Sequence, residues 1–408
     1  MTISKLISVH HIGGRAGTQV FPDLENFRND IVNVLYDADA DCIQQIKNTN
    51  DGKKSPTYVL QYCLSDRCKT NELNITYDPY GSSLFEFNPD YQSYYSYSSA
   101  HDNLFSENMS IQEKRTINTV NLDYIVSREK IPAPNFLSVD TQGAEYDILL
   151  GAKEMLKSHV VAIVLEAYIH PLYKGHKLFG DICRLLDSQG FHFIRFLYIN
   201  EASSFRAPLG FRGQGLQVLS DALFFRKPDY VTSSKPEENY CLLKKLAFVA
   251  FIYNQSEYAI DCINRSKKFA PTGQRDEGLE YLKFLNEVEA LYEKTDKLLP
   301  ETFRHYFPSF ELSKARFDSK EIQKYQTKSI KYLLKSKIPW LHRILKGVKG
   351  LLRSMSRAYS DFIKCHLTSY SPIEKLFLRY NLKKQADLLR KYRLDQSLSV
   401  TSKNGKLK

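Results

Sequence analysis

Short apolar runs alternate with stretches of helical spacing along the first half of the chain. The runs are rich in Val, Ile, Leu and Phe and have the length of buried strands, while the stretches between them repeat apolar residues every three or four positions. This alternation is typical of βαβ units and a mostly parallel sheet. We therefore expect a doubly wound α/β domain with helices over 39–47, 143–157 and 178–189 and seven strands over 6–12, 31–36, 58–64, 135–140, 160–167, 191–199 and 222–227.

The stretch 71–113 breaks this rhythm. It is rich in Tyr, Ser and Asn, as in YDPYGSS and NPDYQSYYSYSSAHDN. Asn, Ser, Gly and Pro favour turns and loops. We predict an insertion over one end of the sheet, where its tyrosines could form a lid that excludes water from a binding site.

The composition changes again after Pro228. TSSKPEEN (232–239) has the composition of a linker, and the sequence that follows is nearly all of helical period. A chain of 408 residues also exceeds what one hydrophobic core usually supports. We predict an α/β domain over 1–229, a linker over 230–240 and an all-α region over 241–408.

The charge divides in the same place. Residues 1–229 hold 22 Lys and Arg against 27 Asp and Glu, a net of −5, and residues 230–408 hold 35 against 19, a net of +16. The segment 322–360 contains ten Lys or Arg and no acid, opposite an apolar face that follows Trp340. Such a helix can lie on an anionic inner membrane face, dock on a partner enzyme, or pack with a solvated basic face. No nucleic-acid-reading motif accompanies the charge, so we do not expect nucleic acid as a partner.

The seven cysteines form no CxxC pair, and their number is odd. This argues against a disulfide framework or a zinc site and favours a reducing compartment. The start of the chain lacks a signal-peptide pattern, and no apolar run approaches the ~20 residues that span a bilayer. We expect a cytoplasmic protein, located at the inner membrane face if the basic helix binds lipid, and we assign no metal site.

A glycine-rich turn and an acid follow the first two predicted strands. Gly13, Gly14 and Gly17 come after the first strand, where glycines let the backbone approach a ligand closely. Asp37 ends the second strand, where a carboxylate can accept hydrogen bonds from both hydroxyls of a ribose. A purely structural turn and a helix N-cap are the alternatives.

Three acids come together around the fourth and fifth strands. In SVDTQGAEYDILLGA (138–152), Asp140 ends a strand and Glu145 lies at the start of the next helix, and Glu166 arrives on the following strand. Such a cluster can raise the proton affinity of one carboxylate and make it a base, or hold a divalent cation. The alternative is helix capping by Asp140 and a favourable helix-dipole position for Glu145.

A second candidate base lies in the loop EAYIHPLYKGH (166–176). His170 follows the strand end directly, and an unperturbed imidazole titrates close to neutral pH. The alternative is a solvated or structural loop histidine.

Several of these segments together resemble the FkbM family of S-adenosylmethionine-dependent methyltransferases. The resemblance covers about 5–228 and is supported by LSD (64–66), GSSL (81–84) and VNLDYI (120–125). It rests mainly on four segments, FLSVDTQGAEYDILLGAKEML, VVAIVLEAYIHPLYKGH, GDICRLLDSQGFHF and LSDALFFRKP.

The resemblance implies a Rossmann-like, seven-strand class I methyltransferase domain that uses S-adenosylmethionine and methylates hydroxyls, often of sugars. Gly13 and Gly17 then correspond to the loop at the methionine moiety, with His11 where the family usually has an acid. The other roles implied are Asp37 at the ribose, Ser65 and Asp66 at the adenine edge, and Asp140, Glu145 and Glu166 at the floor of the transfer site, with a carboxylate or His170 as the base.

Two functions follow from these observations. The first is O-methyl transfer to a sugar hydroxyl of a surface polysaccharide or related glycan. The alternative is a catalytically inactive Rossmann-like module that binds a nucleotide or a partner, which the histidine at His11 favours. A nicotinamide dehydrogenase is disfavoured because the first turn lacks the GxGxxG fingerprint.

Overall fold

The computed structural model describes residues 4–13, 21–50, 55–91, 97–98, 105–203, 215–271, 278–296 and 372–391. The chain divides into two compact units, Met1–Asn286 and Glu287–Lys408. Each unit is described by itself below.

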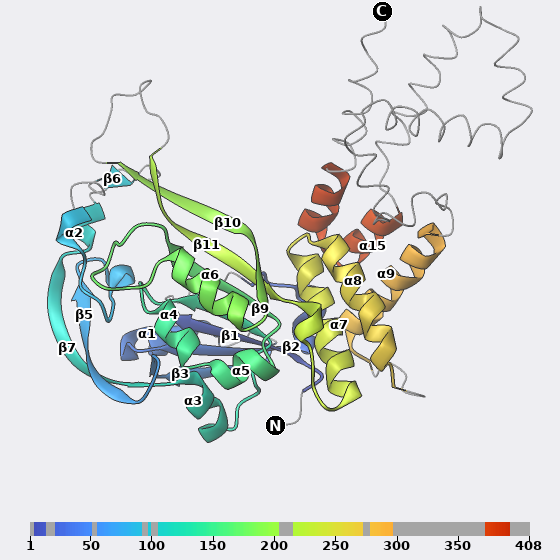
Figure 1. Cartoon of the computed structure of the whole chain (residues 1–408), viewed down its shortest axis with the longest axis horizontal. Helices are drawn as coiled ribbons and strands as arrows, with labels where there is room; N and C mark the ends of the chain where they lie inside the picture. The colour runs from blue at the N-terminus through green and yellow to red at the C-terminus, as the bar shows by residue number, and fades with distance from the viewer. Residues whose placement is uncertain are drawn as a thin grey trace, which may run out of the picture. The chain divides into compact units, whose positions relative to one another are not determined.

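A mixed β-sheet forms the centre of the first unit (Figure 1). Its parallel part contains β1 (Ile7–Gly13), β2 (Ile31–Asp37), β3 (Thr57–Gln61), β8 (Phe136–Asp140) and β9 (Ala162–Tyr168). The antiparallel part contains β11 (Leu216–Arg226), β10 (Phe191–Ser203) and the two-residue β6 (Tyr97–Ser98). The strand order is β3-β2-β1-β8-β9-β11-β10-β6, which confirms the predicted α/β fold and its seven strands, with β6 as an addition at the edge.

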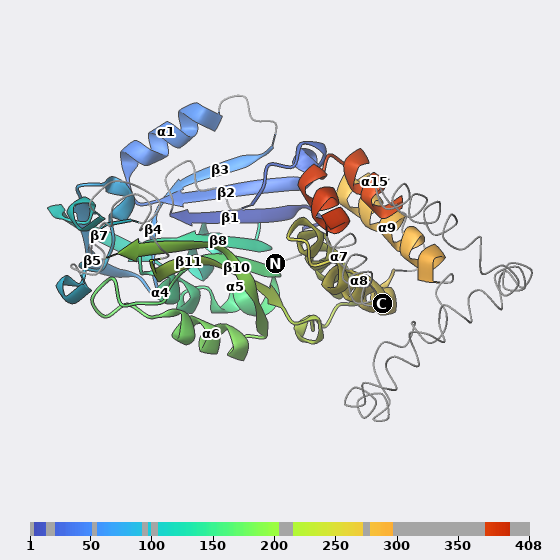
Figure 2. The ribbon, with the colours of Figure 1, turned by 90° about the horizontal axis from the view of Figure 1, so that it is seen from above.

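Four helices pack into one core with the sheet (Figure 2). They are α3 (Leu122–Arg128), α4 (Glu145–Leu150), α5 (Lys153–Ser158) and α6 (Phe179–Ser188), while α1 (Ala40–Asn50) packs beside β2 and β3. The single helix predicted over 143–157 is therefore two helices, separated at Gly151. A Cβ at Gly151 would lie 2.2 Å from the carbonyl oxygen of Ser65, so the chain must pass another loop closely where the helix breaks.

A second, three-stranded sheet brackets the predicted insertion 71–113, which begins inside β5 and ends inside β7. It has the order β4-β7-β5, with β4 (Cys63–Leu64), β7 (Ile111–Val120) and β5 (Lys69–Thr76). The predicted strand 58–64 was wrong in its extent, because β3 ends at Gln61 and β4 pairs with the second sheet. In Figure 2 the arrow of β1 points toward this sheet, which thus stands at the carboxyl edge of the parallel strands. The short elements nearby are η2 (Pro79–Gly81), η3 (Pro89–Tyr91) and α2 (Phe105–Asn108).

Two helices after the predicted boundary at 229 belong to the first unit. They are α7 (Pro236–Ile252) and α8 (Ser256–Ser266), and the predicted linker 230–240 is wrong in that α7 already begins at Pro236. Phe136 stacks on Tyr253 with centroids 5.9 Å apart, and Phe225 meets Tyr258 at 5.4 Å. Phe136 and Phe225 point away from the core that contains α3–α6, and Figure 2 shows α7 and α8 at the amino ends of the parallel strands. Most residues of α7 are buried, as expected for a helix that is apolar nearly all round. The linker-like composition at its start did not predict this burial.

The remaining elements complete the described chain. Two short 3₁₀ turns, η4 (Pro228–Tyr230) and η5 (Lys267–Phe269), flank α7 and α8, and η1 (Glu25–Asp30) precedes β2. The helices that follow are α9 (Glu280–Asp296), α15 (Pro372–Arg379) and a helix over 383–391. In the second unit, Glu287 accepts a hydrogen bond from the Tyr380 hydroxyl at 3.0 Å and pairs with Arg379 at 2.6 Å.

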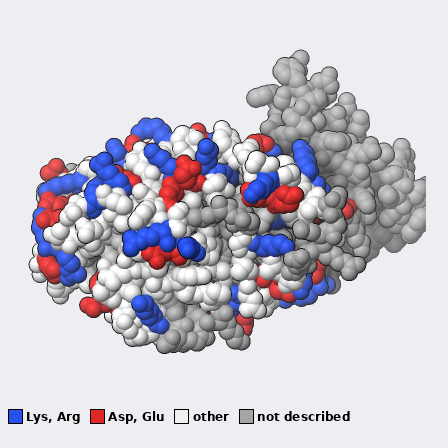
Figure 3. Space-filling model, turned by 90° about the horizontal axis from the view of Figure 1, so that it is seen from below, with Lys and Arg blue, Asp and Glu red and all other residues white. Residues whose placement is uncertain are grey.

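The predicted basic helix 322–360 lies outside the described residues. No helix in the described ranges is long and apolar enough to cross a bilayer. On the face drawn in Figure 3, Lys and Arg side chains lie interspersed with Asp and Glu, so that face shows no extended patch of one sign.

A fully buried lysine joins α7 to the start of the sheet. The Lys245 ammonium donates to the carbonyl oxygens of Ser4 and Leu6 at 2.5 and 2.6 Å and to the Asn135 Oδ1 atom at 2.8 Å. Burial lowers its pKa to about 8. The three acceptors satisfy the three N–H groups, which is the condition for burying an ammonium group at tolerable cost.

We therefore expect Lys245→Met to lower the free energy of unfolding by about 3 kcal/mol, because three acceptors around a fully buried ammonium group lose its hydrogen bonds. Urea unfolding of the full chain, followed by circular dichroism, measures this change. Lys268→Met, at an exposed position of η5, is the matched control and should change stability by no more than about 0.5 kcal/mol. Equal stability of the two variants would contradict the role of Lys245.

Candidate functional site

A pocket of about 270 Å³ opens at the carboxyl ends of the parallel strands. Ligands of open α/β sheets bind at this edge. Polar residues at its floor come from three strand ends and the loop after β8, namely Gly13, Asp37, Asp140 and Gln142. The apolar residues around them include Ile12, Tyr36, Leu64, Leu73, Ile75 and Leu84.

The floor depends on a close approach of β1 and β8. Gly13 is paired with Asp140 in the sheet register and has a φ of +72°. A Cβ at Gly13 would lie 2.0 Å from the Asp140 carbonyl oxygen, so only glycine fits here. The predicted glycine turn therefore leaves open backbone at the floor of the pocket; Gly14 and Gly17 lie outside the described residues.

Asp37 lines the pocket and shapes the turn that precedes α1. Its Oδ1 atom accepts the Asp39 N–H at 2.8 Å, and its Oδ2 atom accepts the Cys42 thiol at 3.1 Å. The N-cap role that was the alternative for Asp37 belongs to Asp39, whose Oδ1 atom accepts the Asp41 N–H at 3.0 Å at the start of α1. A carboxylate has about four lone-pair positions, so the two bonds of Asp37 leave acceptor capacity toward a ligand.

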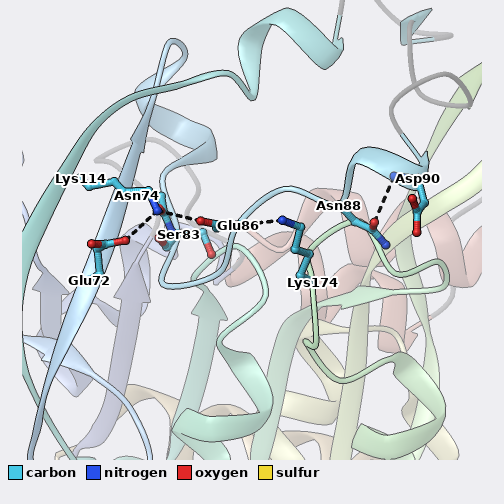
Figure 4. A network of polar contacts seen from close by, with 8 residues as sticks. All are labelled: Glu72, Asn74, Ser83, Glu86, Asn88, Asp90, Lys114 and Lys174. Carbon is cyan, nitrogen blue, oxygen red and sulfur yellow. Dashed lines mark hydrogen bonds and ion pairs between the residues drawn. The ribbon is translucent and has the colours of Figure 1, made fainter.

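The outer wall of the pocket is tied to the loop after β9. Figure 4 shows Glu86 between two lysines: its carboxylate lies 2.7 Å from the Lys114 ammonium and 2.9 Å from that of Lys174. The same segment pairs through the backbone, because Asn88 N–H donates to the Leu172 carbonyl at 2.8 Å. Lys114 also pairs with Glu72 on β5 at 2.9 Å. The wall segment is therefore joined to both β7 and the loop that follows β9.

Glu145 closes the loop between β8 and α4. Its carboxylate accepts the Thr141 N–H at 2.8 Å, the Thr141 hydroxyl at 3.1 Å and the Gly143 N–H at 3.0 Å. The side chain is 1% exposed and does not line the pocket. Glu145 also stands in the first turn of α4, the helix-dipole position that was the alternative for it.

Gln142 connects the two other predicted acids. Its Nε2 atom donates to Asp140 Oδ1 and to Glu166 Oε2, each at 2.9 Å. Its Oε1 atom accepts the Tyr173 hydroxyl at 2.9 Å. The Tyr168 hydroxyl lies 3.3 Å from Oε1 and donates its one hydrogen to Glu166, which is closer. The structure thus brings Asp140, Glu145 and Glu166 together, but of the three only Asp140 lines the pocket.

Burial makes this cluster weakly acidic. Loss of hydration raises the pKa of Asp140 and, well above its usual range, that of Glu166, where the nearby Asp140 adds to the effect. Burial also raises the pKa of Glu145 to about 7 and that of Asp221 to about 6. Such perturbed groups beside a pocket are typical of a functional site.

The other predicted site residues lie away from the pocket surface. His11 is buried on β1 beside Ser138 and is not a lining residue. Ser65 is buried and Asp66 pairs with Lys69 at 3.0 Å, whereas their neighbours Cys63 and Leu64 do line the pocket. The half-buried His170 ring meets Tyr91 with centroids 6.2 Å apart and is also outside the lining.

Two kinds of residue were missed in the sequence. In the sequence, the acids of the DTQGAE motif were singled out but Gln142, which stands in the middle of that motif, was not. The wall residues Ser82 and Ser83 were noted only as part of a resemblance, and nothing in their local pattern indicates that Ser83 bonds to the Gln142 carbonyl oxygen, 59 positions away, at 2.5 Å.

Residues 43–193 match the family model of the methyltransferase FkbM domain. The match includes Asp140, Glu145 and Glu166 but begins after Gly13 and Asp37. No curated protein matches the chain.

Two solved structures are similar at low identity. The first is methyltransferase FkbM from Methylobacillus flagellatus KT, with 13% identity and a TM-score of 0.31, covering 55% of this chain and 44% of that one. The second is precorrin-6y C5,15-methyltransferase from Geobacter metallireducens GS-15, with 9% identity and a TM-score of 0.27, covering 54% of this chain and 80% of that one. The chain therefore spans less than half the length of the first of these structures.

The raised pKa of Asp221 predicts a pH dependence of stability. A carboxyl whose pKa is about 6 folded and near 3.8 unfolded binds more protons in the folded state between these values, so its contribution to stability falls as the pH rises from about 4 to 6. As the pH rises from 4.5 to 7, we expect the free energy of unfolding of Asp221→Asn to increase by about 2 kcal/mol relative to that of the unmodified protein. Urea unfolding at the two pH values measures it, and a constant difference would contradict the shift.

Proposed function

We propose that the chain, whose residues 43–193 match the family model of the methyltransferase FkbM domain, transfers the methyl group of S-adenosylmethionine to a hydroxyl oxygen of a sugar. The observation that carries the proposal is the convergence of Gly13, Asp37 and Asp140 on one pocket at the strand ends. The position methylated lies outside the proposal.

The residues at the pocket fit the proposed cofactor. Open backbone at Gly13 admits the methionine portion, and the Asp37 carboxylate accepts hydrogen bonds from ribose hydroxyls. Apolar residues such as Leu64 and Ile75 offer a surface to a purine ring. The Asp140 carboxylate suits a cationic ligand by simple charge complementarity.

Asp140 is the base that the geometry favours. Glu145 is occupied by the loop it caps, Glu166 lies behind Gln142, and His170 does not line the pocket. Among these candidates Asp140 lines the pocket, and within the described residues its carboxylate accepts from a single donor, Gln142.

When bound, S-adenosylmethionine supplies a methyl carbon already activated by a positively charged sulfur. The protein then has to orient the acceptor and remove one proton from its hydroxyl. In the proposal the Asp140 carboxylate takes that proton and later releases it to solvent. The raised pKa of Asp140, caused by burial, strengthens it as a proton acceptor.

Exposed tyrosines at the pocket wall favour a sugar as the acceptor. Tyr80 lines the pocket and is 60% exposed, and Tyr77 nearby in sequence is 68% exposed. Exposed aromatic faces combined with hydroxyl and carboxylate acceptors are suited to the apolar faces and hydroxyl edges of sugar rings. We extend the proposal to the glycan of a surface polysaccharide as the acceptor. The chain would methylate this glycan at the cytoplasmic face of the membrane, where the glycan would be assembled.

Asp37→Asn tests the cofactor site while keeping the acceptor for the Asp39 N–H. We expect the Kd for S-adenosylmethionine to rise about tenfold, because a charged acceptor for ribose becomes neutral. Isothermal titration calorimetry on the full chain measures this. Asp41→Asn, on the exposed first turn of α1, is the control and should bind as the unmodified protein does.

Asp140→Asn separates binding from chemistry. We expect S-adenosylmethionine to bind within about threefold of the original affinity, while transfer of a labelled methyl group to neutral oligosaccharides falls by at least about 10²-fold, the usual loss for a missing general base. Mass spectrometry of the product locates the methyl group.

Three outcomes would overturn parts of this proposal. Absence of cofactor binding by the folded, unmodified chain would favour the inactive binding module. A methyl group on nitrogen or carbon would overturn oxygen as the acceptor. Full activity of Asp140→Asn would remove Asp140 as the base.

A further inference from the structure

Gln142 has a backbone conformation that its side chain does not favour. Its φ is +55°, in the left-handed region, which costs a residue other than glycine about 1 kcal/mol. Gly143 follows with a φ of +103°. Strain of this kind persists where the surroundings determine the conformation, and such places are often functional.

The surroundings of Gln142 fix its amide in one orientation. Two carboxylates, Asp140 and Glu166, face Nε2, and both can only accept when ionised. The Tyr173 hydroxyl faces Oε1 as a donor. A flipped amide would place its oxygen against the two carboxylates, acceptor against acceptor, so the contacts determine which way the amide points.

The backbone of Gln142 is held from the pocket side as well. Its carbonyl oxygen accepts the Ser83 hydroxyl at 2.5 Å, and both residues line the pocket. The Glu145 carboxylate holds the N–H groups on either side of it, at Thr141 and Gly143. The residue is thus fixed by the wall, by α4 and by β9 at the same time.

We propose that Gln142 is the positioning residue of the transfer site, whose amide holds the Asp140 carboxylate toward the pocket. The inference rests on the proposed role of Asp140 as the base. Gln142 does not itself exchange a proton; it acts through Asp140.

The charges around Asp140 show why such a residue is needed. Carboxyl groups approach from three elements and two phenols approach from the β9 side, and no lysine or arginine in the described ranges is among the groups that shift its pKa. A hydrogen bond from Gln142 lowers the pKa of Asp140, opposing the effect of burial. The neighbouring titratable groups are Glu145 on α4, Glu166 and Tyr168 on β9, Tyr173 after β9, Asp221 on β11 and Asp37 on β2.

The shared amide also divides the roles of the two acids. Both amide hydrogens are used, one for each carboxyl, and Glu166 receives the Tyr168 hydroxyl in addition. Asp140 therefore has its Oδ1 atom fixed by Gln142, while its Oδ2 atom accepts no hydrogen bond from the described part of the chain. That second oxygen is the one that can meet an acceptor hydroxyl.

Gln142→Asn tests the inference without disturbing the backbone, because asparagine tolerates the left-handed region and its shorter amide cannot reach both carboxyls. We expect methyl transfer at pH 7 to fall by about 10- to 100-fold with the KM for S-adenosylmethionine nearly unchanged. We also expect the acid limb of the rate profile to move to higher pH, because Asp140 loses a donor that favours its ionised form.

Lys130→Asn is the matched control. Lys130 has a φ of 53° and lies after α3, outside the pocket, so it places the same substitution in the same backbone conformation. Its rate profile should be unchanged. A Gln142→Asn protein that is folded and keeps the original acid limb would overturn the positioning role.

A second measurement needs no activity. Infrared difference spectra recorded during a pH titration follow carboxyl protonation, and subtraction of the Asp140→Asn spectra isolates the Asp140 band. Gln142→Asn should move the midpoint of that band upward, and an unmoved midpoint overturns the inference. If the unmodified chain transfers no methyl group but the midpoint moves, the proposed function fails while the effect of Gln142 on Asp140 stands.

Discussion

The left-handed turn at Gln142 and Gly143 is the constraint on which the site depends. It directs the chain from β8 into α4 within a few residues, and the Glu145 carboxylate replaces the missing helical partners of the N–H groups there. A Cβ at Gly143 would lie 3.1 Å from the Tyr173 ring, so the turn also sets how closely the loop after β9 can pack. The pocket wall is attached to that same loop through Asn88 and Glu86.

The opposite end of the sheet is fixed by different chemistry. There the buried Lys245 satisfies carbonyl groups before β1, and Asn135, just before β8, accepts from both Lys245 and the Ser8 N–H. The two strands that carry Gly13 and Asp140 are thus held together at their starts as well as at their ends. A rigid pair of strands gives the pocket floor a defined geometry without support from the loops alone.

How far the sequence predicts this molecule depends on where each contact originates. The parallel strands were found because buried strands are continuous apolar runs, and Gly13, Asp37 and Asp140 were found because strand ends carry the ligands of such sheets. In contrast β7 was missed, since most of its residues are exposed and polar. Gln142 was missed for another reason: its partners Ser83, Glu166 and Tyr173 are distant in sequence, and a glutamine has no local pattern that predicts them.

A cluster of buried acids is unfavourable for an empty site and suitable for a site that receives positive charge. Desolvation disfavours each ionised carboxyl, and at short range each ionised neighbour disfavours the next. The proposed cofactor brings positive charge to Asp140, which lowers the cost of ionising this one carboxyl while Glu166, behind Gln142, stays the more readily protonated of the two. In this arrangement the binding of the ligand and the readiness of the base are coupled through a single electrostatic interaction.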